Sequence, residues 1–268
     1  MSSKWLFPSD IDELVGLLER DNPLVHGGGT GIPRGRVRSS KVVVDLGRMG
    51  WNRCYEDGKN LLLGATCTFS RTVEQLSRIR PGHILVSALS RAASTPLRNR
   101  ITLGGSVAFF PLWSDLMGPL LALGASVDLV GTVSGRYPIE HFVSNRGLFR
   151  GAVIRSVVVP DLPVDSWYYR EVRVGFDYPG FTMTLLAQRD GDILANFRGV
   201  CVGTKERFKV LKGVSESLKG IRYGDVDVNA VAEKLELDFP DKKSGSGEYF
   251  GQVAKVWFER GLAELLER

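Results

Sequence analysis

A glycine-rich loop that directly follows a predicted strand most constrains what this chain folds into. Leu24 and Val25 begin the strand, and six residues of sequence His-Gly-Gly-Gly-Thr-Gly follow at positions 26–31. Glycine reaches positive φ and lets backbone N–H groups approach a ligand closely, so a row of such groups makes an anion-binding nest. The spacing matches neither a Rossmann GxGxxG nor a P-loop, and a tight surface turn would produce the same pattern. The loop alone therefore leaves phosphate binding and a simple turn both open.

A second glycine pair favours ligand binding. Gly104 and Gly105 lie between the hydroxyl residues Thr102 and Ser106, and Ser114-Asp115 follows shortly after them. Two nests and one acid suit a dinucleotide. At the start of a predicted helix, however, an aspartate can equally well complement the helix dipole.

Composition and charge exclude several classes of protein. The chain has 268 residues, and its 35 basic residues are interspersed with 30 acidic ones. Scattered charge of this kind gives no basic stripe for nucleic acid, so we expect no nucleic-acid partner. No stretch approaches the ~18–20 apolar residues of a membrane span, and residues 1–8 lack the apolar region of a secretory signal. We therefore expect a cytoplasmic protein without a membrane span.

Cysteines and histidines do not indicate a metal centre. No CxxC or HxxxH spacing occurs among Cys54, Cys67, Cys201, His26, His83 and His141. Such spacing is the usual sequence signature of zinc and iron–sulfur sites. We expect no metal site, no disulfide framework, and cysteines that act as small core residues.

Hydrophobic periodicity predicts a mixed α/β chain up to about residue 160, and strands followed by helices beyond it. A proline-rich, acidic stretch at 160–165 predicts the boundary between the two parts. Predicted strands cover 42–46, 61–65, 126–130, 152–159, 167–174, 182–188 and 193–203. Predicted helices begin after an N-cap at Ser9 and after Ser114, and otherwise cover 69–79, 84–93, 208–218, 229–235 and 248–266.

These motifs, taken together, resemble the FAD-binding subunit of the molybdenum hydroxylases, the xanthine and carbon monoxide dehydrogenase family. The first loop and the strand after it are similar to the first FAD signature of that family. The most specific similarity is in the middle of the chain, where the order and spacing reproduce the second FAD signature. The residues that carry the resemblance are 26–30, 43–46, 63–68, 92–94, 98–100, 102–106, Pro111 and 114–116.

The resemblance implies an α+β fold of three parts. Two α/β FAD-binding subdomains, of the kind also found in vanillyl-alcohol oxidase (the PCMH type), would cover residues 1–55 and 56–162. A small domain of antiparallel sheet plus helices, like the C-terminal domain of CO dehydrogenase flavoproteins, would cover residues 163–268.

The resemblance also implies the residues that contact FAD. The first loop and the second glycine pair would present their backbone to the pyrophosphate from two sides, and Asp115 would bind sugar hydroxyls. Ile154 would pack against the isoalloxazine, and Arg170 would lie near the flavin ring in place of a family lysine, with Tyr169 as the neighbouring alternative in the alignment. The full set is Gly27, Gly28, Gly29, Thr30, Gly31, Thr102, Gly104, Gly105, Ser106, Ser114, Asp115, Ile154 and Arg170.

The implied function is one step in an electron-transfer chain. A molybdopterin-binding large subunit would oxidise the substrate, a small [2Fe-2S] subunit would pass the electrons on, and the FAD of this chain would deliver them to an acceptor. NAD, quinone, ferredoxin and oxygen all stay open as acceptors. Two alternatives also stay open: a self-contained FAD-dependent oxidoreductase, and a non-catalytic nucleotide-binding assembly module. No residue of this chain is expected to act as an acid or base.

Overall fold

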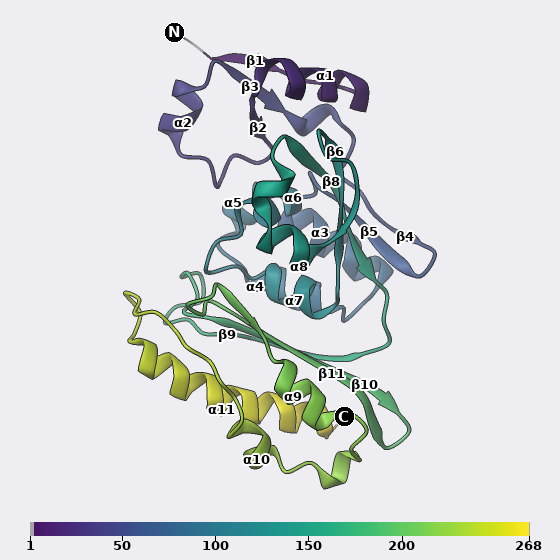
Figure 1. Ribbon diagram of the computed structural model, residues 1–268, viewed down its shortest axis with the longest axis vertical. Helices are drawn as coiled ribbons and strands as arrows, with labels where there is room; N and C mark the ends of the chain where they lie inside the picture. The colour runs from purple at the N-terminus through teal and green to yellow at the C-terminus, as the bar shows by residue number, and fades with distance from the viewer. Residues whose placement is uncertain (1–2, 268) are drawn as a thin grey trace. The chain divides into compact units, whose positions relative to one another are not determined.

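A computed structural model describes residues 3–267 of the chain and divides it into two compact units. The first unit comprises the residues up to Ser90 together with Ser94–Phe110 and Gly124–Asp161. The second unit comprises Arg91–Ala93, Pro111–Leu123 and the residues from Leu162 onward. The two units are described separately below (Figure 1).

The first unit begins with a three-stranded parallel sheet of order β1-β3-β2. Its elements are β1 (Lys4–Leu6), α1 (Ile11–Asp21), β2 (Leu24–His26), α2 (Arg34–Ser39), β3 (Val42–Asp45) and the short η1 (Leu46–Arg48). The side chain of Asp10 caps α1 by accepting from the N–H of Glu13 at 2.8 Å, so the predicted cap at Ser9 was wrong by one residue. The N–H of Ser9 instead donates to the Glu13 carboxylate at 3.0 Å, which completes a reciprocal cap.

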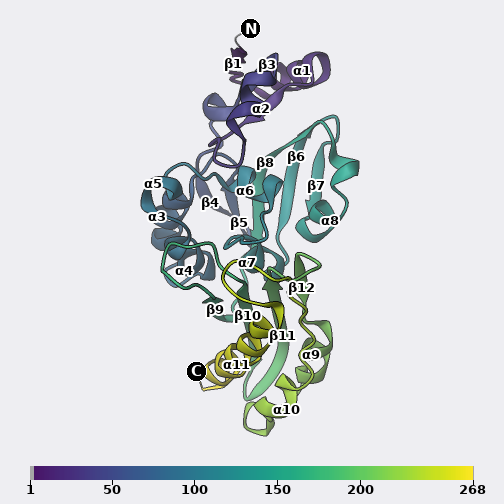
Figure 2. The same ribbon diagram turned by 90° about the vertical axis from the view of Figure 1, so that its left-hand side faces the viewer.

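The larger sheet of the first unit is antiparallel and has the order β4-β5-β8-β6-β7 (Figure 2). Its strands are β4 (Cys54–Asp57), β5 (Asn60–Gly64), β6 (Ser126–Gly131), β7 (Gly135–Pro138) and β8 (Ala152–Pro160). The helices of this part are α3 (Phe69–Ile79), α4 (Ile84–Arg91), α5 (Thr95–Arg98), α6 (Leu103–Phe109), α8 (Ile139–Ser144) and η2 (Arg146–Phe149). Helix α6 packs on β5 and β8, and this contact places the second glycine pair.

The two sheets of the first unit share one apolar core. Leu14 and Leu18 of α1 pack with Val44 of β3, Val130 of β6 and Val153 of β8. Each of these side chains is less than one tenth exposed. Burial of this kind stabilises a fold by roughly 25 cal/mol per Å² of apolar surface, so the core fixes the small sheet against the large one. It thereby fixes the loop that leaves β2.

The second unit is an antiparallel sheet of order β12-β11-β10-β9 with helices packed on it (Figure 2). Its strands are β9 (Asp165–Arg170), β10 (Thr182–Asp190), β11 (Ile193–Val202) and β12 (Phe208–Val210). Its helices are α7 (Met117–Ala122), α9 (Lys212–Leu218), η3 (Tyr223–Asp225), α10 (Val228–Ala232) and α11 (Gly247–Leu266).

Strand β10 is buried on both faces, because helices contact it from two sides. Met183 and Leu185 belong to the main core of the unit, together with Phe250 and Phe258 of α11. The alternate residues of β10 face α7, where a Cβ on Gly118 would lie 2.8 Å from the Thr184 hydroxyl. A strand with both faces covered is a continuous run of buried residues, as residues 182–187 of β10 are.

Two expectations about the second unit need correction. The predicted helix at 208–218 is the short strand β12 followed by α9, and the predicted strand at 167–174 ends at Arg170. Residues 111–123 belong to the second compact unit, where α7 contacts β10 and β11. The domain bounds 1–55, 56–162 and 163–268 stay a prediction. The α+β fold class itself is confirmed by the two antiparallel sheets and their helices.

The part of the chain that the structure describes lacks both a membrane-spanning helix and a metal-binding cluster. None of the helices is both long and apolar enough to cross a membrane. Within residues 3–267, histidine, cysteine, aspartate and glutamate nowhere form a group of three or more that could hold a metal ion.

Candidate functional site

The first glycine loop leaves the end of β2 and is held there by a partly buried polar pair. Nδ1 of His26, the last residue of β2, lies 2.6 Å from Oδ2 of Asp45, the last residue of β3. Gly29 has a φ of +73°, and a Cβ added there would lie 2.4 Å from Nε2 of the His26 ring. Only glycine fits this conformation without strain. His26 therefore fixes the path of the loop as well as the end of the strand.

The loop lies directly against the chain segment that precedes α6. A Cβ on Gly28 would fall 1.6 Å from the carbonyl oxygen of Arg100, and one on Gly27 would fall 3.0 Å from Oγ1 of Thr102. A guanidinium nitrogen of Arg100 donates to the carbonyl of Gly28 at 3.3 Å. The structure thus brings together two of the predicted site segments, 27–31 and 100–102, which are far apart in the sequence.

The backbone of the loop offers a row of free donors. Within the part of the chain that the structure describes, the N–H groups of the five residues 27–31 have no hydrogen-bond acceptor. Gly27, Gly28 and Gly29 are half-buried, whereas Thr30 and Gly31 are exposed. Half-buried N–H groups normally have a partner, and consecutive N–H groups of a turn point into a concavity that suits an anion. A phosphate group bound on this loop would satisfy them.

The second glycine pair differs from the expected nest, because its N–H groups are already engaged. Residues 103–109 form helix α6, the N–H of Gly104 donates to Ala65, and that of Gly105 donates to Oγ1 of the capping Thr102 at 3.3 Å. The N–H of Ser106 donates to the carbonyl of Thr102. Gly104 serves close packing instead, since a Cβ there would lie 2.7 Å from the Cβ of Ala65. This pair therefore positions α6 and Thr102 next to the first loop.

An aromatic ring that sequence reasoning did not select borders the first loop. Phe109, the last residue of α6, is 47% exposed, and its ring would lie 3.2 Å from a Cβ on Gly31. The next residue, Phe110, ends the helix with a positive φ of 38° and is fully buried. Helical spacing alone places residue 109 two turns beyond the cap at 102, which is the signal that could have identified it.

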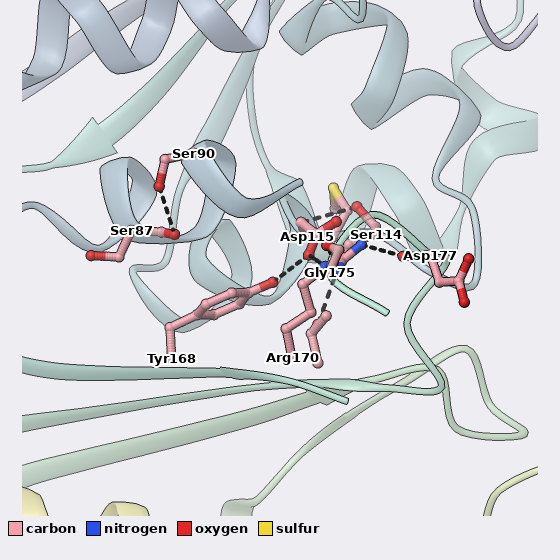
Figure 3. Close-up of polar contacts among 10 residues, drawn as sticks. Ser87, Ser90, Ser114, Asp115, Tyr168, Arg170, Gly175 and Asp177 are labelled. Atoms are coloured by element: carbon pink, nitrogen blue, oxygen red, sulfur yellow. Dashed lines mark hydrogen bonds and ion pairs between the residues drawn. The ribbon is translucent and has the colours of Figure 1, made fainter. Parts of the chain in front are cut away.

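In the second unit, two predicted site residues bind each other (Figure 3). Nε of Arg170 donates to Oδ1 of Asp115 at 2.7 Å, and the hydroxyl of Tyr168 donates to the same oxygen at 2.7 Å. The two charged side chains are only 6% and 7% exposed. The remaining guanidinium nitrogens of Arg170 donate to the carbonyls of Gly175 and Asp177 and so hold the loop after β9.

Burial and the ion pair act in opposite directions on this carboxylate. Burial raises the pKa of Asp115, while the charge of Arg170 and the hydrogen bonds from Tyr168 and Arg170 lower it. Burial also raises the pKa of the Tyr168 phenol well above its ordinary value, and the neighbouring Asp115 raises it further. Tyr168 therefore stays a neutral hydrogen-bond donor. The arrangement is a closed, buried ion pair in which Oδ1 of Asp115 has its donors within the protein.

Ser114 and Ile154 are also held within their own units. The hydroxyl of Ser114 accepts from the N–H of Met117 at the start of α7, and its carbonyl accepts from Thr182. Ile154 lies in β8 opposite Leu129 of β6 and is 5% exposed. The predicted contacts of Ser114, Asp115, Ile154 and Arg170 with FAD stay predictions.

Comparisons with known proteins agree on one family. Residues 1–162 match the family model described as the FAD binding domain in molybdopterin dehydrogenase. The chain is 30% identical over 274 residues to the nicotine 6-hydroxylase medium subunit of Paenarthrobacter nicotinovorans, covering 97% of this chain and 96% of that protein. It is 26% identical to subunit alpha of the 6-hydroxypseudooxynicotine dehydrogenase complex of the same organism, covering 92% of this chain and 88% of that protein.

Solved structures show the same fold. A chain of quinoline 2-oxidoreductase from Pseudomonas putida 86 superposes with a TM-score of 0.86 at 19% identity, covering 100% of this chain and 98% of that one. A chain of reconstituted CO dehydrogenase from Oligotropha carboxidovorans also gives 0.86 at 18% identity, covering 100% and 99%.

Proposed function

Since the chain belongs to the family of FAD-binding domains in molybdopterin dehydrogenases, we propose that it is the subunit of a molybdenum hydroxylase complex that passes electrons from [2Fe-2S] clusters to an external acceptor. The bound FAD would supply the redox chemistry, accepting electrons from the clusters and releasing them to the acceptor. The residues of this chain bind that cofactor and orient it.

The observation that carries the proposal is the row of free N–H groups at residues 27–31. Five consecutive donors without an acceptor in the described structure, on a loop that Gly28 and Gly29 pack against Arg100 and His26, fit the pyrophosphate of FAD. Thr102 lies beside this loop and borders the same position. Gly104 and Gly105 contribute by holding α6 and its cap in place.

The remaining predicted site residues have less direct support. Oδ1 of Asp115 is occupied by Arg170 and Tyr168, so a sugar hydroxyl would have to bind its Oδ2. Arg170 lowers the pKa of that carboxylate, against the effect of burial, and so favours its charged form. Ile154 lies in β8 and is only 5% exposed, so a flavin ring would contact no more than a small part of its side chain.

The proposed partners would supply the iron–sulfur clusters, for which we find no ligand set among the described residues of this chain. Iron–sulfur clusters are usually held by four cysteine thiolates, and no cluster of metal-binding side chains is present among the described residues. The relatives from Paenarthrobacter nicotinovorans are named as subunits, one of them of a dehydrogenase complex. We therefore propose a molybdopterin-binding large subunit and a [2Fe-2S] small subunit as partners.

Purification of the tagged chain from its native cells tests this proposal. We expect FAD, molybdenum and iron to co-purify in fixed ratio. A chain that carries FAD without either metal, and that turns over a substrate by itself, would favour a self-contained oxidoreductase. A folded chain without flavin would favour an assembly module and overturn the proposal.

A further inference from the structure

Two of the three cysteines meet inside the first unit. Cys54 begins β4 and Cys67 follows the end of β5, and their sulfur atoms lie 3.6 Å apart. Cys54 is 7% exposed and Cys67 is fully buried. Both are buried, as expected of small core residues, and they also contact each other. Cys201 lies in the second unit and is fully buried.

One of the two cysteines borders a cavity that is open to solvent. Cys54 lines an open cavity of about 760 Å³ in the first unit. Arg53 and Arg71 also line this cavity, and neither has an acidic partner among the residues that the structure describes. The third arginine of the lining, Arg78, is paired with Glu74. The cavity is thus positively charged where it borders Cys54.

The two thiols share a hydrogen bond, and this favours loss of one proton from the pair. The bond from Cys54 lowers the pKa of Cys67, although burial opposes this effect, while the same bond and burial raise the pKa of Cys54. The positive charge of Arg71 lowers the pKa of both thiols. Either sulfur can be the donor, so the shared proton can lie on either atom. A thiolate is the reactive form of cysteine, and arginine beside it increases its population.

We propose that Cys54 and Cys67 are a redox-active dithiol, and that a hydroperoxide entering the arginine-lined cavity oxidises them to a disulfide. When the proton that the pair shares lies on the Cys67 sulfur, the Cys54 thiolate attacks the outer oxygen of the peroxide, the O–O bond breaks, and an alkoxide or hydroxide leaves and takes up a proton. Cys54 is then a sulfenic acid. The Cys67 sulfur attacks the Cys54 sulfur, an S–S bond forms, and water leaves. In total, two thiols lose two electrons and two protons, and the peroxide is reduced to an alcohol, or to water when it is hydrogen peroxide, together with one water.

The geometry supports formation of a disulfide between Cys54 and Cys67 without a large movement of the backbone. The sulfur atoms, at 3.6 Å, are already in contact; Cys54 begins β4, and Cys67 lies three residues after the end of the adjacent strand β5. Cys54 is held by its N–H, which donates to the side-chain oxygen of Gln75, and Cys67 by its N–H, which donates to the carbonyl of Gly64. A bond between residues 54 and 67 would therefore link two segments that the sheet already fixes.

Hydrogen peroxide is the probe for the experiment, applied to the reduced, full-length protein. We expect the intact mass to fall by that of two hydrogen atoms, with a non-reduced peptide joining residues 54 and 67. Cys201→Ser should behave as the wild type. Cys67→Ser should stop at an oxidised Cys54 that reacts with dimedone, and Arg71→Gln should slow disulfide formation severalfold without changing the product.

Other results would overturn the inference. Oxidation of Cys201 before the pair, stepwise gain of oxygen at Cys54 without a disulfide, or a pair that stays reduced while circular dichroism shows a folded protein would each do so. The wild type and Arg71→Gln are enough to test disulfide formation, so the proposal can be rejected even if a cysteine variant does not fold. The inference does not depend on FAD binding.

Discussion

The guanidinium of Arg170 donates to the carboxylate of Asp115 across 2.7 Å while both side chains are more than nine-tenths buried. The two residues are 55 positions apart in the chain, and the pair joins the segment before α7 to the end of β9. Tyr168 adds a second hydrogen bond to the same oxygen. A buried carboxylate without a positive partner is very unfavourable, so each residue depends on the other.

Arg170→Met should therefore destabilise the second unit strongly. Removing one partner of a buried pair costs about 3–5 kcal/mol, because the remaining charge is left uncompensated. Hydrogen exchange measured by mass spectrometry on peptides from β9 and β10 would show the loss as faster exchange. Asp115→Asn in the same chain should recover much of the protection, since it removes that charge.

The matched control for this substitution is an exposed ion pair. Arg78 and Glu74 lie four residues apart on α3, and their side chains are 74% and 59% exposed. Exposed pairs of this kind contribute about 0.3–0.5 kcal/mol, so Arg78→Met should leave exchange nearly unchanged. Equal effects of the two arginine substitutions would show that the buried pair is not important for the second unit.

A second prediction concerns the packing of Gly104 against Ala65. A Cβ on Gly104 would lie 2.7 Å from the Ala65 Cβ, so Gly104→Ala should lower the melting temperature. Overpacking of this kind costs about 1–3 kcal/mol. Ala65→Gly removes the closest atom and should restore part of the loss in the double variant. Additive losses, with no recovery, would contradict the packing role of Gly104.

A third prediction concerns stability against acid. Burial lowers the pKa of His83 from its usual 6.5, and Nδ1 of its ring accepts a hydrogen bond from the N–H of Leu85. The nearby Asp161 raises this pKa and Arg80 lowers it. Because the folded state resists protonation, the unfolded state binds more protons below pH 6.5. The contribution of His83 to stability is therefore full above that pH and declines as the pH falls towards the folded-state pKa.

Melting temperatures at pH 7.5 and 5.5 test this directly. One proton accounts for at most about 1.4 kcal/mol of unfolding free energy per pH unit. The wild type should lose more stability between the two pH values than His83→Gln, whose side chain keeps a hydrogen-bond acceptor without titrating. An equal loss in both proteins would rule out His83 as the cause.

Local sequence patterns predicted the elements that carry a strong apolar period. Helix α3 has the predicted bounds 69–79, because Phe69, Thr72 and Leu76 recur on its buried face after the cap at Thr68. Helix α2 was not predicted, since it is short and polar and buries none of its side chains. Helix α6 was not predicted because two adjacent glycines are poor helix formers. It forms because Leu103 and Val107 are buried and Thr102 caps it.

The sequence predicted which residues belong to the candidate site but not the contacts that they make. The glycine loop at 27–31 was recognisable because glycine after a strand is a local signal. Residue spacing does not show which backbone N–H groups have an acceptor. The N–H groups of Gly104 and Gly105 donate to Ala65 and Thr102, whereas those of the first loop have no acceptor among the described residues. The contacts between Asp115 and Arg170, and between Cys54 and Cys67, likewise arise from packing between distant segments.

The central claim is that the first loop binds the cofactor. Equilibrium titration with FAD, with quenching of flavin fluorescence as the signal, tests it. The apo protein should bind one FAD. Gly28→Ala should weaken binding at least about tenfold, a loss of 1.4 kcal/mol, because its Cβ would displace the loop from the Arg100 carbonyl. Gly35→Ala is the matched control in the same unit, since a Cβ there meets no atom within 4 Å. Unchanged FAD affinity in a folded Gly28→Ala protein, or a folded wild type that does not bind FAD, would contradict the account.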